Sequence, residues 1–319
     1  MKRNQTIDIM KFIFSICIIA IHSSFLKEVN VTLYSIITMG LFRIAVPFFF
    51  ITSGYFYYKK VSQNKETKSY ILRLIKIFVI FEIIEIILYT PFQLSSLQGI
   101  GIVYYLWRII STGLGGAYWY IISTIISLLI LTPLWKKKKI TIPLVVGLVL
   151  YLFMMTNDSY GAVFEGTFIQ NIAKFHTWIW LWPQSGLCSS IFYLSIGAYI
   201  YEKQPKVKNM KPLLILSIIL LIVEAYLLQT HGAYDGNGYL SLIISAPLLF
   251  IYVLKHPIHI KFQYFGKMSL YVYMIHQIML QVLRFILPVV NNSNELLFVL
   301  CAIITVLLSY LLSKKVKTI

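Results

Sequence analysis

Ten mostly apolar stretches, separated by short polar segments, constrain what this chain can fold into. A transmembrane helix needs about 20 largely apolar residues, and flanking residues or local bilayer thinning complete a shorter stretch. The chain is 59% hydrophobic and 12% charged, whereas soluble domains average roughly 45–50% apolar and about 25% charged. These values exclude an ordinary soluble enzyme and a disordered chain. The predicted spans are Phe12–Leu26, Tyr34–Tyr58, Ile77–Phe92, Tyr118–Trp135, Ile140–Met155, Trp178–Tyr201, Leu213–Leu228, Tyr239–Leu254, Ser269–Pro288 and Leu296–Leu312.

The distribution of positive charge predicts how these spans are oriented. The chain has 28 Lys and Arg residues against 11 Asp and Glu residues, a net charge of +17. Lys and Arg collect in the cytoplasmic loops of membrane proteins, so this excess predicts a membrane topology rather than binding to nucleic acid. With ten spans and both termini in the cytoplasm, most basic residues fall on one side, in segments 2–11, 59–76, 136–139, 203–211, 255–267 and 314–317.

The segment Gln98–Thr112 decides the number of spans. It is apolar, but it contains two glycines and Arg108. As an eleventh span it would move Lys136–Lys139 to the outside, so we interpret it as a re-entrant or interfacial piece on the outer side. We expect residues 1–319 to form one all-α membrane domain without a fused soluble domain. The cysteines are expected to be small packing residues inside it, and they are Cys17, Cys188 and Cys301.

Ionisable side chains within the first span and at its inner end are candidates for function, because such groups are costly in a membrane. Lys11 and His22 are eleven residues apart, which places them within about 20° of the same helix face, and Asp8 and Ser15 lie on that side. About 16 Å separates Lys11 from His22 along the axis, so the two would serve different parts of a long ligand or of a path. The alternative is that Lys11 anchors the helix at the headgroups and His22 makes a helix–helix hydrogen bond.

Two further pairs of charged residues lie at the inner end of the third predicted span and within it. Arg73 and Lys76 share a face at its inner end, where two cations can hold an anionic phosphate group. A topology anchor is at least as good an interpretation of this pair. Glu82 and Glu85 repeat the spacing deeper in the span, and pairing with Arg43, or with Arg73 and Lys76, would make them structural.

His276 and Glu224 also lie inside predicted spans, where a structural role agrees with the sequence as well as a functional one does. The sequence contains no nucleotide-phosphate loop and no HExxH, CxxC or GxSxG motif. The cysteine spacing fits no zinc site. The sequence therefore predicts neither a metal centre nor an active site of the kind found in conventional soluble enzymes.

Four stretches, taken in order, resemble the signature segments of the membrane acyltransferase-3 family. The first has a basic residue ten intervening residues before a histidine, and the third is similar to the family's R-x-x-R motif. Lys stands at two positions where the family often has Arg. The stretches are distributed over nearly the whole chain. They are Ile7–Lys11 with Ile21-His22, Arg43–Tyr55, Arg73-Leu74-Ile75-Lys76 and Ser269–His276. The run Tyr118-Trp119-Tyr120, before a predicted helix that ends in Pro133, fits the family as well.

This resemblance implies a multi-pass enzyme of the plasma membrane. It would move acyl groups, commonly acetyl, from cytoplasmic acyl-CoA (acetyl-CoA) to a surface glycan or another envelope acceptor, without a metal. The resemblance implies that His22 and Lys11 are catalytic, and that Arg43, Arg73 and Lys76 bind the acyl-CoA donor. A histidine suits general-base catalysis, because its ordinary pKa of about 6.5 is near the working pH. Lys lacks the bidentate fork with which Arg grips phosphate.

A transporter is the alternative function. The membrane parts of vancomycin-resistance-type serine racemases resemble the same family, and they are associated with moving a small amino acid. In such a transporter the charged helix faces would line the substrate path. A racemase would need a further soluble domain after Ile319, so we expect the acyltransferase. The acceptor stays open among surface polysaccharide, peptidoglycan, teichoic acid, exported glycolipid and a small metabolite, and no oligomeric state is predicted.

Overall fold

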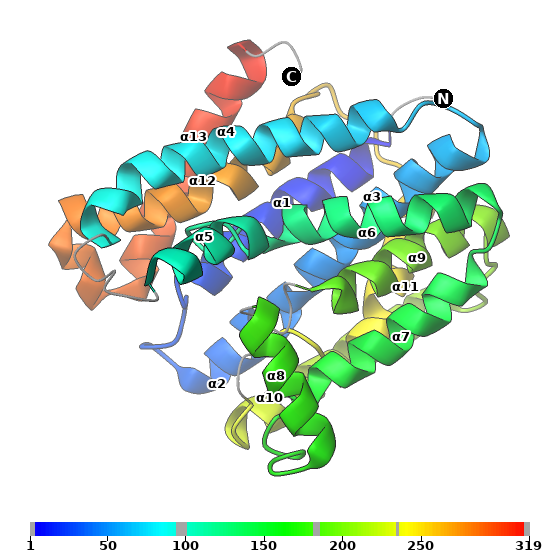
Figure 1. Cartoon of the computed structure of the whole chain (residues 1–319), viewed down its shortest axis with the longest axis horizontal. Helices are drawn as coiled ribbons and strands as arrows, with labels where there is room; N and C mark the ends of the chain where they lie inside the picture. Colours follow the sequence, from blue (N-terminus) through cyan, green and yellow to red (C-terminus); the bar gives the residue numbers. More distant parts are fainter. Residues whose placement is uncertain (1–3, 94–100, 181–185, 234–235, 316–319) are drawn as a thin grey trace. The chain divides into compact units, whose positions relative to one another are not determined.

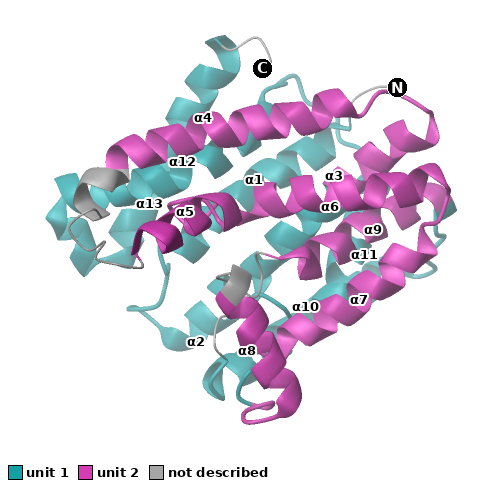
Figure 2. Cartoon of the chain, in the orientation of Figure 1, with its two compact units in different colours: residues 1–52, 158–162, 203–318 teal, residues 53–157, 163–202, 319 magenta. Residues whose placement is uncertain are grey.

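The structure, a computed structural model, describes residues 4–93, 101–180, 186–233 and 236–315 (Figure 1). Within these ranges the regular secondary structure is entirely helical, without a strand, which confirms the predicted all-α class. The chain forms two compact units, which are described separately (Figure 2). Unit 1 contains residues 1–52, 158–162 and 203–318, and unit 2 contains residues 53–157 and 163–202.

Among the residues that the structure describes, six helical segments are long and apolar enough to cross a membrane, which identifies a multi-pass membrane protein. They are α1 (Gln5–His22), the segment Val31–Ser62, α6 (Trp119–Lys136), α10 (Met210–Thr230), α12 (Phe265–Ile286) and α13 (Asn294–Lys315). Two shorter apolar helices are α7 (Thr141–Met155) and α11 (Leu242–Lys255). The other helices that concern the argument are α4 (Lys68–Gln93), α5 (Gly101–Ser111), α8 (Phe168–Trp180) and α9 (Leu187–Lys203).

The second predicted span is not one continuous α-helix. After the short helix α2 (Val31–Leu33) it consists of the π-helix η1 (Tyr34–Thr38), the 3-10 helix η2 (Leu41–Ile44) and α3 (Ala45–Ser62). Gly40 separates η1 from η2, where it packs closely against Ala225 of α10. A Cβ atom at this position would collide with the carbonyl oxygen of Ile36. The break therefore depends on a residue without a side chain.

The sixth predicted span, Trp178–Tyr201, contains parts of two helices. Helix α8 ends at Trp180, and α9 begins at Leu187; residues 181–185 lie outside the described ranges. One continuous span is therefore not confirmed here, because an apolar run does not distinguish one helix from the junction of two.

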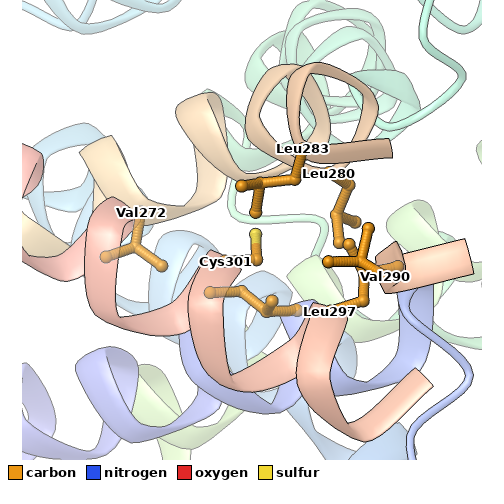
Figure 3. Close-up of a cluster of buried hydrophobic side chains, with 7 residues drawn as sticks. Val272, Leu280, Leu283, Val290, Leu297 and Cys301 are labelled. Carbon is orange, nitrogen blue, oxygen red and sulfur yellow. The ribbon is translucent and has the colours of Figure 1, made fainter. Parts of the chain in front are cut away.

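Unit 1 has its core where α12 packs along both α1 and α13. At the beginning of α1, Gln5 and Thr6 accept hydrogen bonds from the backbone N–H groups of Ile260 (2.7 Å) and Ile258 (2.6 Å). This fixes the start of α1 to the segment after α11. A buried cluster fixes its other end (Figure 3), and the cluster contains Ile19, Val272, Leu280, Leu283, Val290, Leu297 and Cys301.

Unit 2 is organised around α9, which is buried along most of its length. Ser190 of α9 shares a hydrogen bond of 2.6 Å with Ser127 of α6. Gly147 of α7 lies so close to the backbone of Phe192 that a Cβ atom would not fit. Small side chains at such contacts let membrane helices approach closely, since burial of apolar surface from water cannot drive their association.

Candidate active site

His22 is the last residue of α1, and its half-buried side chain lies against His276 of α12. The two imidazole ring centroids are 5.1 Å apart, with an angle of 44° between the ring planes. Ile19, three residues before His22, lies in the buried cluster of unit 1. Val272 and Leu280 lie in the same cluster, one helical turn before and after His276. The packing of α1 on α12 therefore brings the two histidines together.

His276 has one ring nitrogen without a hydrogen-bond partner. Its side chain is fully buried, and Nδ1 donates to the carbonyl oxygen of Tyr273 at 2.6 Å. Because a carbonyl oxygen accepts, Nδ1 carries the hydrogen, and Nε2 of the neutral ring holds a lone pair. Within the described residues Nε2 has no partner. From the sequence, a structural and a functional interpretation of His276 agree equally well with its position, and the structure places it beside His22, the predicted catalytic residue.

Arg43 also lies at the His22 end of unit 1. The guanidinium groups of Arg43 and Arg284 are close enough to His22 to interact with it electrostatically. Arg43 Nη1 donates to Asn237 Oδ1. The buried carboxylate of Asp158 accepts from the backbone N–H of Asn237 at 2.7 Å and from its Nδ2 at 3.2 Å. This network connects η2 with two segments that lie far apart in the sequence.

Asp158 and Asn237 are not candidates from the sequence alone. Each lies in a loop between predicted spans, among other loop residues. Their hydrogen bond joins residues 79 positions apart, so no local sequence pattern indicates it. The one available signal is an acidic residue directly after a span, in the run Thr156-Asn157-Asp158-Ser159.

Lys11 lies on α1 but not next to His22. Eleven residues along a helix correspond to about 16 Å, as the sequence predicts. Lys11 and Asp8 are both half-buried. Ser15, between Lys11 and His22, is buried and donates to the carbonyl oxygen of Phe12 at 2.7 Å. The structure therefore brings His22 together with His276 and Arg43, and it leaves Lys11 near the beginning of the same helix.

Arg73 and Lys76 lie in unit 2, in the first half of α4, with both side chains exposed. Two exposed cations three residues apart on a helix can bind phosphate oxygens without losing any internal partner. Arg73 lies nine residues before Glu82, or about 14 Å along the axis, so the glutamates of this helix do not pair with it. The exposure of both cations fits a donor site and a topology anchor equally.

Glu82 and Glu85 hold a turn of the backbone. Glu82 Oε1 accepts from the N–H of Leu114 at 2.8 Å, and Glu85 Oε2 accepts from the N–H of Gly115 at 2.7 Å. Both carboxylates are buried. The structural reading of this pair is supported, but its partners are backbone groups of the 113–116 turn rather than the arginines and lysine considered from the sequence.

Two bacterial racemases are among the proteins to which this chain is similar. It is 27% identical over 338 residues to an amino-acid racemase of Enterococcus faecalis, covering 99% of this chain and 47% of that protein. It is 26% identical over 285 residues to a serine/alanine racemase of Enterococcus gallinarum, covering 86% of this chain and 40% of that protein. The chain thus spans less than half the length of these relatives. No solved structure matches it.

A family comparison accounts for almost the entire chain. Residues 4–314 match the model of the Acyl_transf_3 family, which is described as an acyltransferase domain. The match includes α1 with His22, η2 with Arg43, α3, α4 and α12 with His276, which are the elements that contain the four stretches compared above. This chain, a multi-pass helical membrane protein, therefore belongs to the acyltransferase-3 family.

Proposed function

We propose that this protein is a plasma-membrane acyltransferase that moves an acyl group, foremost acetyl, from cytoplasmic acyl-CoA to a hydroxyl or amine acceptor of the cell envelope. The family supports acyl transfer. The observation that carries the proposal is a half-buried histidine, His22, at the end of a membrane helix beside a second histidine and two arginines. The direct test supplies radiolabelled acetyl-CoA to inverted membrane vesicles and follows the label into envelope material.

In this mechanism His22 is the general base. One neutral ring nitrogen takes the proton of the acceptor hydroxyl while the oxygen attacks the thioester carbonyl carbon. The C–O bond forms, the C–S bond breaks, and the departing CoA thiolate receives the proton from the His22 imidazolium. The arginine side chains near His22 place positive charge where the carbonyl oxygen becomes negative. Lys11 is assigned to the donor, along the same helix face.

The topology that we propose has ten spanning helices with both termini in the cytoplasm. It is supported by the segregation of Lys and Arg and by helix in every predicted span. Glu82 and Glu85, which bind the 113–116 turn, lie eight to eleven residues before Gln93, the last described residue of α4. The turn is therefore about 12–17 Å from Gln93 along the helix axis. Together with the described part of α5, which has 11 residues and is about 17 Å long, this depth supports a re-entrant piece.

Labelling of single cysteines tests this topology in intact cells. In a background without native cysteines, Gln63, Lys138 and Lys208 replaced by cysteine are expected to resist an impermeant thiol reagent, since their segments carry the cytoplasmic excess of positive charge. Cysteine at Glu165 or Asn292 is expected to react. Each of these positions is exposed, so protection reports the side of the membrane. Labelling of Lys138→Cys from outside would show that the Gln98–Thr112 segment spans the membrane and that the count of ten is wrong.

Donor binding is assigned to Arg73 and Lys76. Replacing either with Gln is expected to weaken acyl-CoA binding by about 1.5–3 kcal/mol, the scale of a charged hydrogen bond. Folding is expected to survive because both side chains are exposed. Equilibrium binding of acyl-CoA to purified protein measures the effect, and the exposed Lys137 and Lys138, replaced together by Gln, are the matched control. Unchanged affinity in the Arg73→Gln/Lys76→Gln protein would make this pair a topology anchor.

Movement of a small amino acid is the second candidate. The relatives named amino-acid and serine/alanine racemases favour it, since a membrane protein related to them could bring serine or alanine to the enzyme. In this case the charged residues of α1 would line a path instead of an acyl-transfer site. Uptake of radiolabelled serine and alanine by vesicles, measured beside acyl transfer from acetyl-CoA, distinguishes the two functions.

A further inference from the structure

The free nitrogen of His276 is an unsatisfied acceptor in the centre of unit 1. The side chain is 0% exposed, and Nε2 has no partner within the described residues. A buried acceptor without a partner costs roughly 1–3 kcal/mol. Val272 and Leu280, one turn away on either side, are apolar cluster residues. Packing alone would therefore be served better by another apolar residue, so the imidazole needs a reason beyond packing.

The neighbouring His22 supplies that reason. An N–H···N hydrogen bond of about 2.9 Å between two imidazole rings placed end to end gives a centroid separation of about 5 Å, since each nitrogen lies about 1.1 Å from its ring centre. The observed separation is 5.1 Å. Because His276 Nε2 has no partner within the described residues, the bond requires that the His22 side chain rotate to meet it. The angle of 44° between the rings is acceptable, because such a bond does not require coplanar rings.

We infer that His276 is the positioning residue of His22: its Nε2 accepts the N–H of His22 and so fixes which His22 nitrogen holds the lone pair. This inference rests on the proposed role of His22. His276 Nδ1 donates its hydrogen to the Tyr273 carbonyl oxygen. A neutral His276 therefore has no hydrogen on Nε2 and can only accept a hydrogen bond from His22. The other His22 nitrogen is then the base that faces the acceptor hydroxyl. A second group that fixes the tautomer of a catalytic histidine is a recurring arrangement.

No proton is transferred to His276 in this scheme. His22 takes the hydroxyl proton on its outward nitrogen and returns it to the CoA thiolate, while its inward N–H stays bonded to His276. The Tyr273 carbonyl holds the orientation of the His276 ring. Cys301 Sγ donates to the backbone carbonyl oxygen of His276 at 3.6 Å and so connects α13 to this turn of α12. These contacts hold His276 Nε2 in place on α12, and the packing of α1 on α12 brings His22 next to it.

Two variants of His276 test the inference by activity. His276→Leu keeps an apolar core but removes the acceptor, and it is expected to lower kcat for acyl transfer on the order of 10- to 100-fold, as loss of supporting hydrogen bonds does at other sites. Binding of acetyl-CoA is expected to be unchanged. His276→Gln places an amide oxygen near the position of Nε2 and is expected to stay within roughly tenfold of the original protein. Equal losses in both variants, at unchanged thermal stability, would overturn the inference.

A spectroscopic measurement tests it without acyl transfer. In purified protein with ¹³C,¹⁵N-labelled histidine, the His22 signals, assigned by their absence in His22→Ala, are expected to show one neutral tautomer. In His276→Leu they are expected to show both tautomers. Identical His22 signals in the two proteins would overturn the pairing, whatever the activity. If the original protein transfers no acyl group but the tautomers respond as expected, the pairing stands and the proposed function fails.

Discussion

Acyl transfer is expected to fall by at least about a hundredfold when His22 is replaced by alanine, because a general base contributes typically 10²–10⁴-fold to the rate. The binding of acyl-CoA is expected to remain nearly intact, since His22 acts on the acceptor hydroxyl and not on the CoA phosphates. Transfer of label from radiolabelled acetyl-CoA to envelope material in inverted vesicles measures the rate. Equilibrium binding of acyl-CoA to the purified variant measures the affinity.

The control for this variant is another histidine of the same unit. His259 is exposed in the segment after α11, so His259→Ala is expected to leave transfer and binding at the level of the original protein. The acyltransferase assignment would be wrong if the original protein transferred no label but took up serine or alanine, and if His22→Ala still took up the amino acid. A histidine that only joins two helices would instead lower stability and leave the rate per folded molecule unchanged.

The helices and the polar face of α1 are predictable from the sequence because both are local periodic patterns. Lys11 and His22 share a face through the helical repeat alone. The partner of His22 is not predictable in this way, since His276 follows it by 254 positions in the sequence and reaches it through the packing of α1 on α12. The sequence presents His276 as one of several intramembrane ionisable residues, and only the fold separates it from the others.

Two other placements depend on backbone features that an apolar pattern does not contain. The break between η1 and η2 directs Arg43 to Asn237 and the His22 end of unit 1, although an uninterrupted helix is expected from the sequence. Glu82 and Glu85 have backbone N–H groups as partners. Backbone donors are present at every residue except proline, so no residue type marks them in advance.

The hydrogen-bond partners of Glu224 are also not predictable from the sequence. Replacement of Glu224 is expected to have the largest effect on stability. Its carboxylate accepts three hydrogen bonds within unit 1, from the Tyr160 hydroxyl at 2.5 Å and from the N–H groups of Leu240 and Ser241 at 2.6 and 2.8 Å. Burial and the Glu224 carboxylate raise the pKa of the Tyr160 hydroxyl, which keeps it protonated as a donor. A charged hydrogen bond contributes about 1.5–3 kcal/mol, so the three together are a substantial part of the stability of a domain.

Glu224→Leu is therefore expected to lower the free energy of unfolding by at least about 3 kcal/mol, because it leaves three donors without their acceptor. Tyr160→Phe removes one donor and its bond, and is expected to cost about 1–3 kcal/mol. The exposed Glu165, replaced by Leu, is the matched control and is expected to stay within about 0.5 kcal/mol. Unfolding of the purified proteins, followed by denaturant titration, measures these differences. If Glu224→Leu unfolded like the control but lost acyl transfer or amino-acid uptake, Glu224 would belong to the functional site and not to the scaffold that joins α10 to residues 158–162.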